Sequence, residues 1–280
     1  MRAMEKLKAA IDNAQSCACI GIDPVLERIP DQIQADSDMS RMRDFCFGVL
    51  DQVAGKAGIV KPQSACFERY GSEGYAILEQ VINRAKDLDL VVILDSKRGD
   101  IGSSAQHYAQ GARSMGADII TLSPYMGRST IQPFLDAGLG VFGLCRTSNP
   151  DADELQCLES GGNLLCHHVG NMLASLDEQS AGQVGAVIGA TNSPKEVQLL
   201  RDAMPSSMFL VPGVGAQGGS ISDVQPMCRP HAKMHSELGV VINASRSVLY
   251  PESLAGENWE EAIGREAVAF ASECASLLID

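Results

Sequence analysis

The sequence lacks a long apolar run and lacks any basic tract. Nowhere do about 18 apolar residues follow one another, as a membrane-spanning helix would need, and residues 1–6 do not lead into the apolar core of a signal peptide. Lys and Arg number 22 against 35 Asp and Glu, a formal charge of −13. This balance disfavours nucleic acids and anionic membranes as partners. The sequence therefore predicts a cytoplasmic protein that binds neither.

Paired cysteine motifs are also missing. The chain has nine cysteines, an odd number, and none of them forms the C-x-x-C pairs of common zinc sites. The adjacent His167 and His168 have no further His or Cys at the spacing of metal ligands. We therefore expect reduced, mostly buried thiols and no metal site.

No Pro/Ser-rich linker divides the 280 residues, of which 45% are hydrophobic, so a single domain over residues 1–280 is predicted. Eight short apolar runs alternate with segments of helical periodicity, such as the one that starts at Ser193-Pro194. This alternation predicts an α/β fold, a closed (β/α)8 TIM barrel rather than an open doubly wound sheet. The predicted strands are 17–22, 58–60, 90–94, 118–122, 140–144, 184–188, 208–211 and 238–242.

Charged residues appear abruptly where two of these strands end. Asp95, Lys97 and Asp100 follow the third apolar run, and Lys61 follows the second. In a barrel the carboxyl ends of the strands share one rim, which is where such folds keep their chemistry. Two lysines and two aspartates would neutralise one another there, and flanking carboxylates would keep Lys97 as an ammonium that can donate a proton. The alternative is a purely structural salt-bridge network.

A glycine-rich loop follows the seventh predicted strand. Gly213, Gly215 and Gly218 match G-x-G-x-x-G, the pattern of a dinucleotide site. Its place after the seventh strand, the preceding Pro212 and the lack of an acidic residue after the next strand disfavour that interpretation. A phosphate-binding loop, with Arg246 as a second contact to the phosphate, is the better hypothesis. An ordinary tight turn stays open as an alternative.

These motifs resemble the orotidine 5′-phosphate decarboxylase family, in its longer bacterial form. The family catalyses the last step of pyrimidine nucleotide (UMP) synthesis, and the resemblance extends over nearly the whole chain. D-x-K-x-x-D after the third strand, combined with a lysine after the second, is its most specific element. The matching segments are 21–24, 61–69, 95–102, 147–150, 212–218 and 243–247.

The resemblance implies a catalytic array of Lys61, Asp95, Lys97 and Asp100, with Lys97 protonating C6 of the ring. It implies no cofactor, because fixed charges in a water-poor pocket would stabilise the carbanion left by CO₂. It also implies a homodimer, since Asp100 is expected to reach into the neighbouring subunit's site. Ser104 stands where relatives often have Thr and would make a similar contact across the subunits to the ribose.

The resemblance further assigns the substrate contacts. Asp23 would hold the ribose hydroxyls, Ser148 would face the edge of the pyrimidine, and Gln217 and Arg246 would bind the phosphate. The small-molecule nucleotide would thus be held from end to end.

Two rival functions remain at this point. One is a metal-dependent sugar-phosphate decarboxylase or aldolase on a related barrel, which resembles enzymes that have an acidic residue where this chain has Lys61. The other is a non-catalytic phosphate-binding barrel. Residues 151–180 have no predicted role; an extra helix, a lid and a packing element are all compatible with them.

Overall fold

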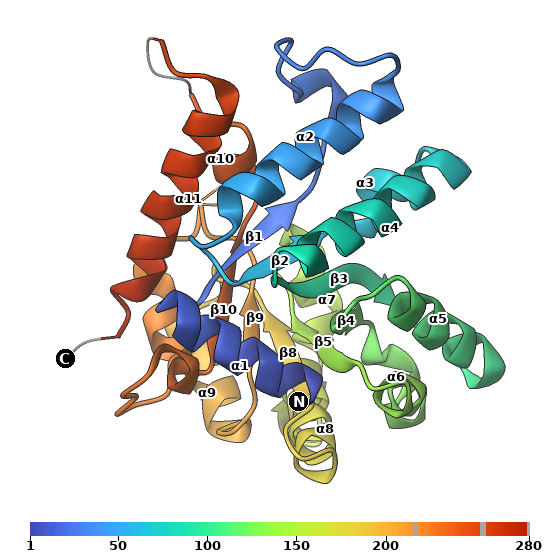
Figure 1. Cartoon of the computed structure of the whole chain (residues 1–280). Coiled ribbons are helices and arrows are strands. Elements are labelled where there is room, and N and C mark those ends of the chain that lie inside the picture. Colours follow the sequence, from blue (N-terminus) through green and yellow to red (C-terminus); the bar gives the residue numbers. More distant parts are fainter. Residues whose placement is uncertain (216–217, 253–255, 279–280) are drawn as a thin grey trace.

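The computed structural model describes residues 1–215, 218–252 and 256–278. In this part of the chain, eight parallel strands close into a barrel with helices around it (Figure 1), which confirms the predicted (β/α)8 fold. Around the barrel each strand pairs with its neighbours in the order β1-β10-β9-β8-β5-β4-β3-β2. The strands are β1 Ala18–Ile22, β2 Ile59–Pro62, β3 Val91–Arg98, β4 Ile119–Leu122, β5 Gly140–Arg146, β8 Val184–Ile188, β9 Phe209–Val211 and β10 Val240–Ala244.

Four strands, β2, β3, β5 and β10, extend past the carboxyl ends of their predicted apolar runs. All residues of β1 and β8 are buried, which explains why such strands read as continuous apolar runs. However, β3 continues through Asp95 and Lys97 to Arg98, and β5 continues to Arg146. Asp95 and Lys97, predicted to follow the third run, are therefore among the last residues of β3, whereas Asp100 lies beyond it. The register between β3 and β4 shifts between Leu94 and Arg98, so β3 is irregular where its charges begin.

Most of the longer helices cover the outside of the barrel, and each buries one apolar face. In α4 the buried residues include Ile77, Leu78, Val81, Ile82 and Ala85, at the spacing of three and four that places side chains on one helix face. The helices are α1 Ala3–Ala14, α2 Asp38–Val53, α3 Ser64–Glu68, α4 Gly71–Asp87, α5 Gly102–Ser114, α6 Gln132–Asp136, α7 Asp153–Gln156, α8 Leu165–Gln179, α9 Pro194–Ala203, α10 Arg246–Leu249 and α11 Trp259–Ala275.

Short 3₁₀ helices occupy several connections. Between β9 and β10 they stand in place of an α-helix, so one crossover of the barrel is made of 3₁₀ turns. The predicted helix start at Ser193 is confirmed, because its side chain accepts the Glu196 N–H and Pro194 is the first residue of α9. The 3₁₀ helices are η1 Leu26–Arg28, η2 Pro124–Met126, η3 Arg128–Thr130, η4 Pro150–Ala152, η5 Ile221–Met227 and η6 His235–Leu238.

Helix α1 lies across the amino end of the barrel. Gly58 precedes β2, and a Cβ there would come within 2.6 Å of the Ala10 carbonyl oxygen. Gly140 begins β5, and its Cβ would lie 3.2 Å from the Ala3 methyl group. In Figure 1 α1 crosses in front of the strands. This end of the barrel is thus closed, and the opposite end is left for a site.

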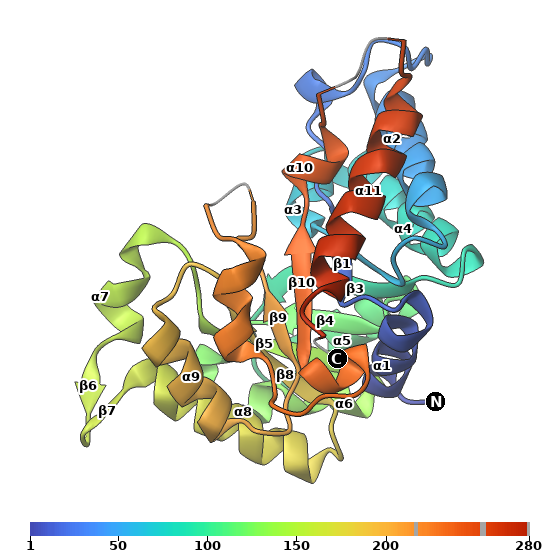
Figure 2. The same ribbon diagram turned by 90° about the vertical axis from the view of Figure 1, so that its left-hand side faces the viewer.

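Residues 151–180, which had no predicted role, belong to two different pieces of the structure. The first comprises η4, α7 and a small antiparallel hairpin of β6 (Glu159–Ser160) and β7 (Asn163–Leu164), inserted after β5. The second is α8, the barrel helix that connects β5 to β8. Figure 2 shows α7 and the hairpin at the left edge of the molecule, far from α1. The insertion therefore belongs to the carboxyl end of β5.

The cysteine thiols are all unpaired, and most of them are buried. All nine thiols are free in the structure, and Cys17, Cys19, Cys46, Cys145, Cys166 and Cys274 are buried. Among the described residues, no helix combines the length and the apolarity that crossing a membrane requires.

Candidate active site

A cavity of about 550 Å³ opens at the carboxyl ends of the strands. Residues from the ends of β2, β3, β4, β5, β9 and β10 line it, and the size is within the usual range for small-molecule sites. Of the predicted site residues it contains Asp23, Lys61, Asp95, Lys97, Ser148, Gly213 and Arg246.

Asp95 is the centre of the charged group in this cavity. Its Oδ2 accepts a hydrogen bond from Lys61 Nζ at 2.8 Å, and its Oδ1 accepts one from Lys97 Nζ at 2.6 Å. The side chains of Lys61 and Asp95 are 5% and 8% exposed, whereas that of Lys97 is 46% exposed. One carboxylate thus holds a buried cation behind it and a second cation that faces the open cavity.

Electrostatics keep this group charged. Burial alone would raise the pKa of Asp95, but the positive charges of Lys61 and Lys97 outweigh it and hold this pKa well below its usual range. Burial alone would lower the pKa of Lys61, but attraction to Asp95 and Asp23 outweighs it and raises this pKa above its usual range. Lys61 and Asp95 are therefore an ammonium and a carboxylate whose charges stabilise one another.

Lys97 has a backbone conformation that is unusual for a lysine. Its φ is 45°, in the left-handed region, where a residue with a Cβ is disfavoured. The Lys97 N–H is held by the Thr121 hydroxyl at 2.9 Å, and the neighbouring β3–β4 register is shifted. Strain of this kind concentrates at functional sites, where the surrounding contacts impose it.

The glycine-rich loop uses the conformational freedom of its glycines. Gly213, Gly215 and Gly218 have φ values of 101°, 76° and 86°. The loop closes on itself, because the Gly215 N–H donates to the Gly219 carbonyl at 2.8 Å and the Gly219 N–H donates to the Gly213 carbonyl at 3.1 Å. Gln217, predicted to bind phosphate, lies outside the described residues. Gly215 lies near Ser247, because a Cβ at Gly215 would be 3.6 Å from Ser247 Oγ. The glycine-rich loop is therefore next to the start of α10.

Two buried acceptor atoms point to a ligand with hydrogen-bond donors. Asp23 Oδ1 and Asn243 Oδ1 have no hydrogen-bond partner among the described residues, although both residues line the cavity. Leaving buried polar atoms unpaired is costly. A ligand that carries hydroxyl or N–H groups would satisfy them.

The comparisons with known proteins agree with this geometry. Residues 19–257 match the model of the orotidine 5′-phosphate decarboxylase / HUMPS family. The chain belongs to this family. It is 37% identical to orotidine 5′-phosphate decarboxylase of Rhodopirellula baltica, over 92% of this chain and 94% of that protein. It is 40% identical to the Verminephrobacter eiseniae enzyme of the same name, over 89% of this chain and 90% of that protein.

A solved structure extends the comparison to three dimensions. The OMP decarboxylase of Leishmania donovani is 30% identical and superposes with a TM-score of 0.80, over 99% of this chain and 98% of that one. This chain and the Leishmania donovani protein therefore have the same barrel fold.

Asp100 and Ser104 do not line the cavity that contains Lys61, Asp95 and Lys97. Both line a separate hollow of about 460 Å³, whose walls come mainly from α4, α5 and β3. Asp100 Oδ1 accepts the Ile101 N–H at 2.8 Å at the exposed start of α5. The structure of one chain of this decarboxylase-family protein thus gathers three of the four predicted charges and separates the fourth from them.

Sequence reasoning missed two residues that hold Asp95. Thr121 Oγ1 donates to Asp95 Oδ1 at 2.8 Å, and Gln63 Nε2 donates to Asp95 Oδ2 at 3.0 Å. Thr121 is a polar residue inside the apolar run of β4, and Gln63 is two residues after Lys61. The available signal for Thr121 was a polar residue within an otherwise apolar strand, but the sequence does not show that its side chain points toward Asp95.

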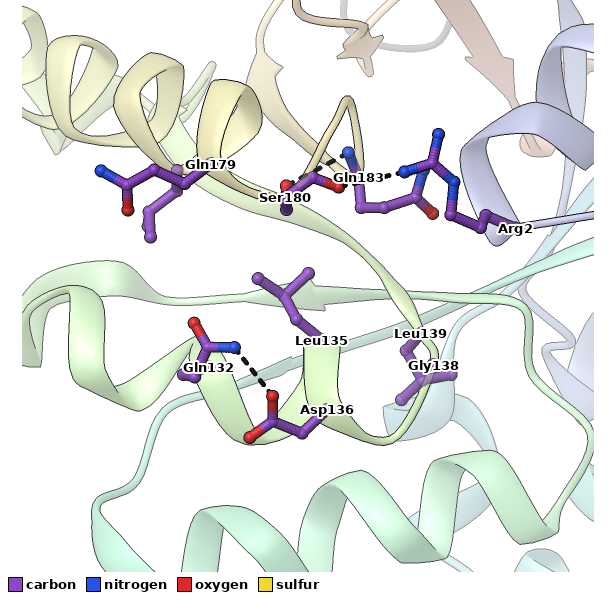
Figure 3. Close-up of a pocket in the computed structure, with 10 residues that line it drawn as sticks. Arg2, Gln132, Leu135, Asp136, Gly138, Leu139, Gln179, Ser180 and Gln183 are labelled. Carbon is purple, nitrogen blue, oxygen red and sulfur yellow. Dashed lines mark hydrogen bonds between the residues drawn. The ribbon is translucent and has the colours of Figure 1, made fainter.

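A second cavity, at the amino end of the barrel, differs in chemistry. Its residues cap α1, end α6 and α8, or precede β5 and β8 (Figure 3). Some of their polar groups bond to one another: Gln132 Nε2 donates to Asp136 at 2.8 Å, and Arg2 Nη1 donates to the Ser180 carbonyl at 3.4 Å. Others bond to residues outside the cavity lining, such as Arg2 Nη2 to Glu5 at 2.7 Å. In the described part of the chain, no three His, Cys, Asp or Glu side chains are grouped as metal ligands.

Proposed function

We propose that this protein decarboxylates orotidine 5′-phosphate to uridine 5′-phosphate and CO₂ without a cofactor, in pyrimidine biosynthesis. The membership of the family supports the reaction. The observation that carries the proposal is the placement of Lys97, whose ammonium lies 2.6 Å from Asp95 and faces a cavity of about 550 Å³. An ammonium group that lies beside a carboxylate and is open to the cavity is what the reaction at C6 needs.

Lys97 and Asp95 would have different tasks in this reaction. When the bond from C6 to the carboxylate carbon breaks, the electron pair stays on C6 and CO₂ leaves. Lys97 would stabilise this carbanion and then donate a proton to C6, after which the Lys97 side chain is a neutral amine. Asp95 would lie near the departing carboxylate, and Lys61, Thr121 and Gln63 would keep Asp95 in place.

Binding energy from distant parts of the nucleotide would position the ring. We assign the phosphate to Arg246 and to the loop containing Gly213, Gly215 and Gly218, with Gln217 as a further contact. The unpaired Asp23 Oδ1 fits ribose hydroxyl groups as donors. Ser148 would face the edge of the pyrimidine.

Asp100 and Ser104 would complete the site of a second subunit in a homodimer. Asp100 is separated from Lys97's cavity in its own chain and lies at the start of α5. The surface around it exposes large apolar side chains, with Ile101 62% and Tyr108 43% exposed, which is typical of an interaction surface. A shared site explains why a charged residue of the motif faces outward.

Activity after exhaustive chelation tests the reaction. Orotidine 5′-phosphate should be converted at an unchanged rate in the presence of a chelator, because side chains alone would supply the charge. Loss of activity that Mg²⁺ restores would refute the proposal in favour of a metal-dependent sugar-phosphate enzyme. Absence of turnover in both conditions would favour a non-catalytic phosphate-binding barrel.

Mixing two inactive variants tests the shared site. Lys97→Ala and Asp100→Ala homodimers should both be nearly inactive. A hybrid dimer would contain one site with both lesions and one intact site, so activity should return on mixing. If subunit exchange is demonstrated and the mixture stays inactive, Asp100 does not act across subunits.

A further inference from the structure

Residues 147–149 form a thin wall between two cavities. On one side, Thr147, Ser148 and Asn149 line the candidate active site. On the other side, the same three residues line a polar cavity of about 300 Å³, together with Arg146 and Glu196. A loop with open space on both faces receives little packing support, so its position depends on specific hydrogen bonds.

Gln156, the last residue of α7, supplies two of these bonds. The Thr147 N–H donates to Gln156 Oε1 at 2.9 Å, and Gln156 Nε2 donates to Thr147 Oγ1 at 2.8 Å. Thr147 Oγ1 in turn donates to Asn149 Oδ1 at 2.6 Å. One amide group therefore holds both the backbone and the side chain of the residue directly before Ser148.

A buried arginine anchors this arrangement to the barrel. Arg146, the last residue of β5, is 6% exposed, and its Nε donates to Glu196 of α9 at 2.7 Å. Its Nη2 donates to Asp153 at the start of α7, and its Nη1 lies 3.5 Å from Gln156 Oε1. The guanidinium thus holds the short helix α7 at both ends, which fixes where Gln156 presents its amide.

The end of β8 packs against residues 147–149 and limits their movement toward β8. Gly189 donates its N–H to the Arg146 carbonyl at 2.8 Å, and a Cβ at Gly189 would come within 2.7 Å of Ser148 Cβ. Ser148 therefore lies directly against a position where no side chain is present. The loop cannot move toward β8, and Gln156 holds it at Thr147.

We infer that Gln156 is a positioning residue for substrate recognition, acting through Thr147 to place Ser148 at the cavity wall. The insertion after β5, which contains α7, thereby helps to position the wall of the active site. The inference rests on the proposed function, in which Ser148 contacts the pyrimidine ring. It assigns a purpose to α7 that neither the motifs nor the barrel architecture predicts.

A double-mutant cycle tests the coupling between Gln156 and Ser148. Gln156→Met keeps the volume of the side chain and removes both hydrogen bonds. It should lower kcat/KM for orotidine 5′-phosphate by about tenfold, the effect of one or two lost hydrogen bonds. In a Ser148→Ala background the same change should cost less than about twofold, whereas in an Arg246→Ala background it should cost the full factor.

The control variant is Glu154→Ala, an exposed residue on the same helix, which should leave kcat/KM unchanged. If Gln156→Met reduced kcat/KM by the same factor in all backgrounds, its role would be merely structural and the inference would be wrong. No reduction in the wild-type background would also overturn it.

Hydrogen exchange of the Thr147 amide gives a readout that does not need activity. Gln156→Met should accelerate exchange of this amide, and Glu154→Ala should not. Unchanged exchange in Gln156→Met would overturn the inference even in an active enzyme. Absence of turnover in the wild-type protein would instead refute the proposed function, while exchange would still decide whether Gln156 orders the loop.

Discussion

Two buried aspartates at opposite ends of the barrel have similar partners. Asp95, near the carboxyl end of β3, is 5% exposed and binds Lys61 and Lys97. Asp118, just before β4, is 2% exposed and binds Lys6 at 3.2 Å and Lys86 at 2.6 Å. Its Oδ2 also accepts the Val92 N–H at 3.1 Å. In both places one carboxylate pairs with two ammonium groups.

The surroundings of the two groups differ. Lys61 is buried behind Asp95 and Lys97 opens onto a large cavity, whereas Lys6 and Lys86 reach Asp118 from outside, with side chains 39% and 33% exposed. Lys97 also has a left-handed φ, and neither Lys6 nor Lys86 is among the described residues with positive φ. The same charges therefore join strands and helices at one end and face a cavity at the other.

Removing one lysine from each group should give the largest contrast. Lys97→Ala should lower kcat by about a thousandfold, because it removes both the proton donor and the charge beside C6. Lys86→Ala should leave kcat within about twofold and lower the free energy of unfolding by up to about 1 kcal/mol. Turnover assays and urea unfolding of both variants measure this contrast, and comparable losses of kcat would contradict it.

The two cavities can be compared through their arginines. Arg246→Ala should cost roughly 1.5–3 kcal/mol of transition-state stabilisation, measured as kcat/KM, because a charged hydrogen bond to phosphate is lost. The loss should be much smaller with the phosphate-free nucleoside. Arg2→Ala, at the cavity of the amino end, should change neither value. Equal losses on both substrates would show that Arg246 does not bind phosphate.

The Asp95 group should also leave a trace in acid unfolding. The pKa of Asp95 is lowered in the folded protein, so below about pH 4, near its unfolded value, the unfolded state binds the extra proton first. The contribution of Asp95 is therefore complete above about pH 5 and declines as the pH falls. Asp95→Asn should show a shallower loss of unfolding free energy between about pH 5 and 2. Parallel curves for the two proteins would argue against a charged Asp95.

The backbone strain at Lys97 predicts the smallest effect. Lys97→Gly should be more stable than Lys97→Ala by about 0.5–1 kcal/mol, because only glycine adopts a left-handed φ without cost. At Ser96, which is not among the residues with positive φ, the order should reverse and Ala should be the more stable substitution. Urea unfolding of these four variants compares the two positions, and the same order at both would refute the strain.

Much of the site could be predicted because its residues terminate apolar strands. Lys61, Asp95 and Lys97 were expected at one rim, and the structure brings them together. Asp100 was grouped with them, and the resemblance assigned it to the neighbouring subunit's site. In its own chain it lines a different hollow, because β3 ends at Arg98 and the chain turns into α5. Thr121 and Gln156 were missed, since their partners lie 26 and 9 residues away in the sequence and no local pattern joins them.

The sequence by itself determined the eight strands and the charges at their ends, because burial on both faces and the change to charge at a strand end are local properties. The resemblance of its motifs indicated the family. Only the tertiary structure decided that Asp95 lies at a cavity and that Asp118 joins the amino end of the barrel to lysines of α1 and α4. Both are aspartates beside an apolar strand with two lysines in reach. They differ in whether the barrel leaves a cavity beside them, and that depends on how α1 covers one end and how the loops after the strands surround the other.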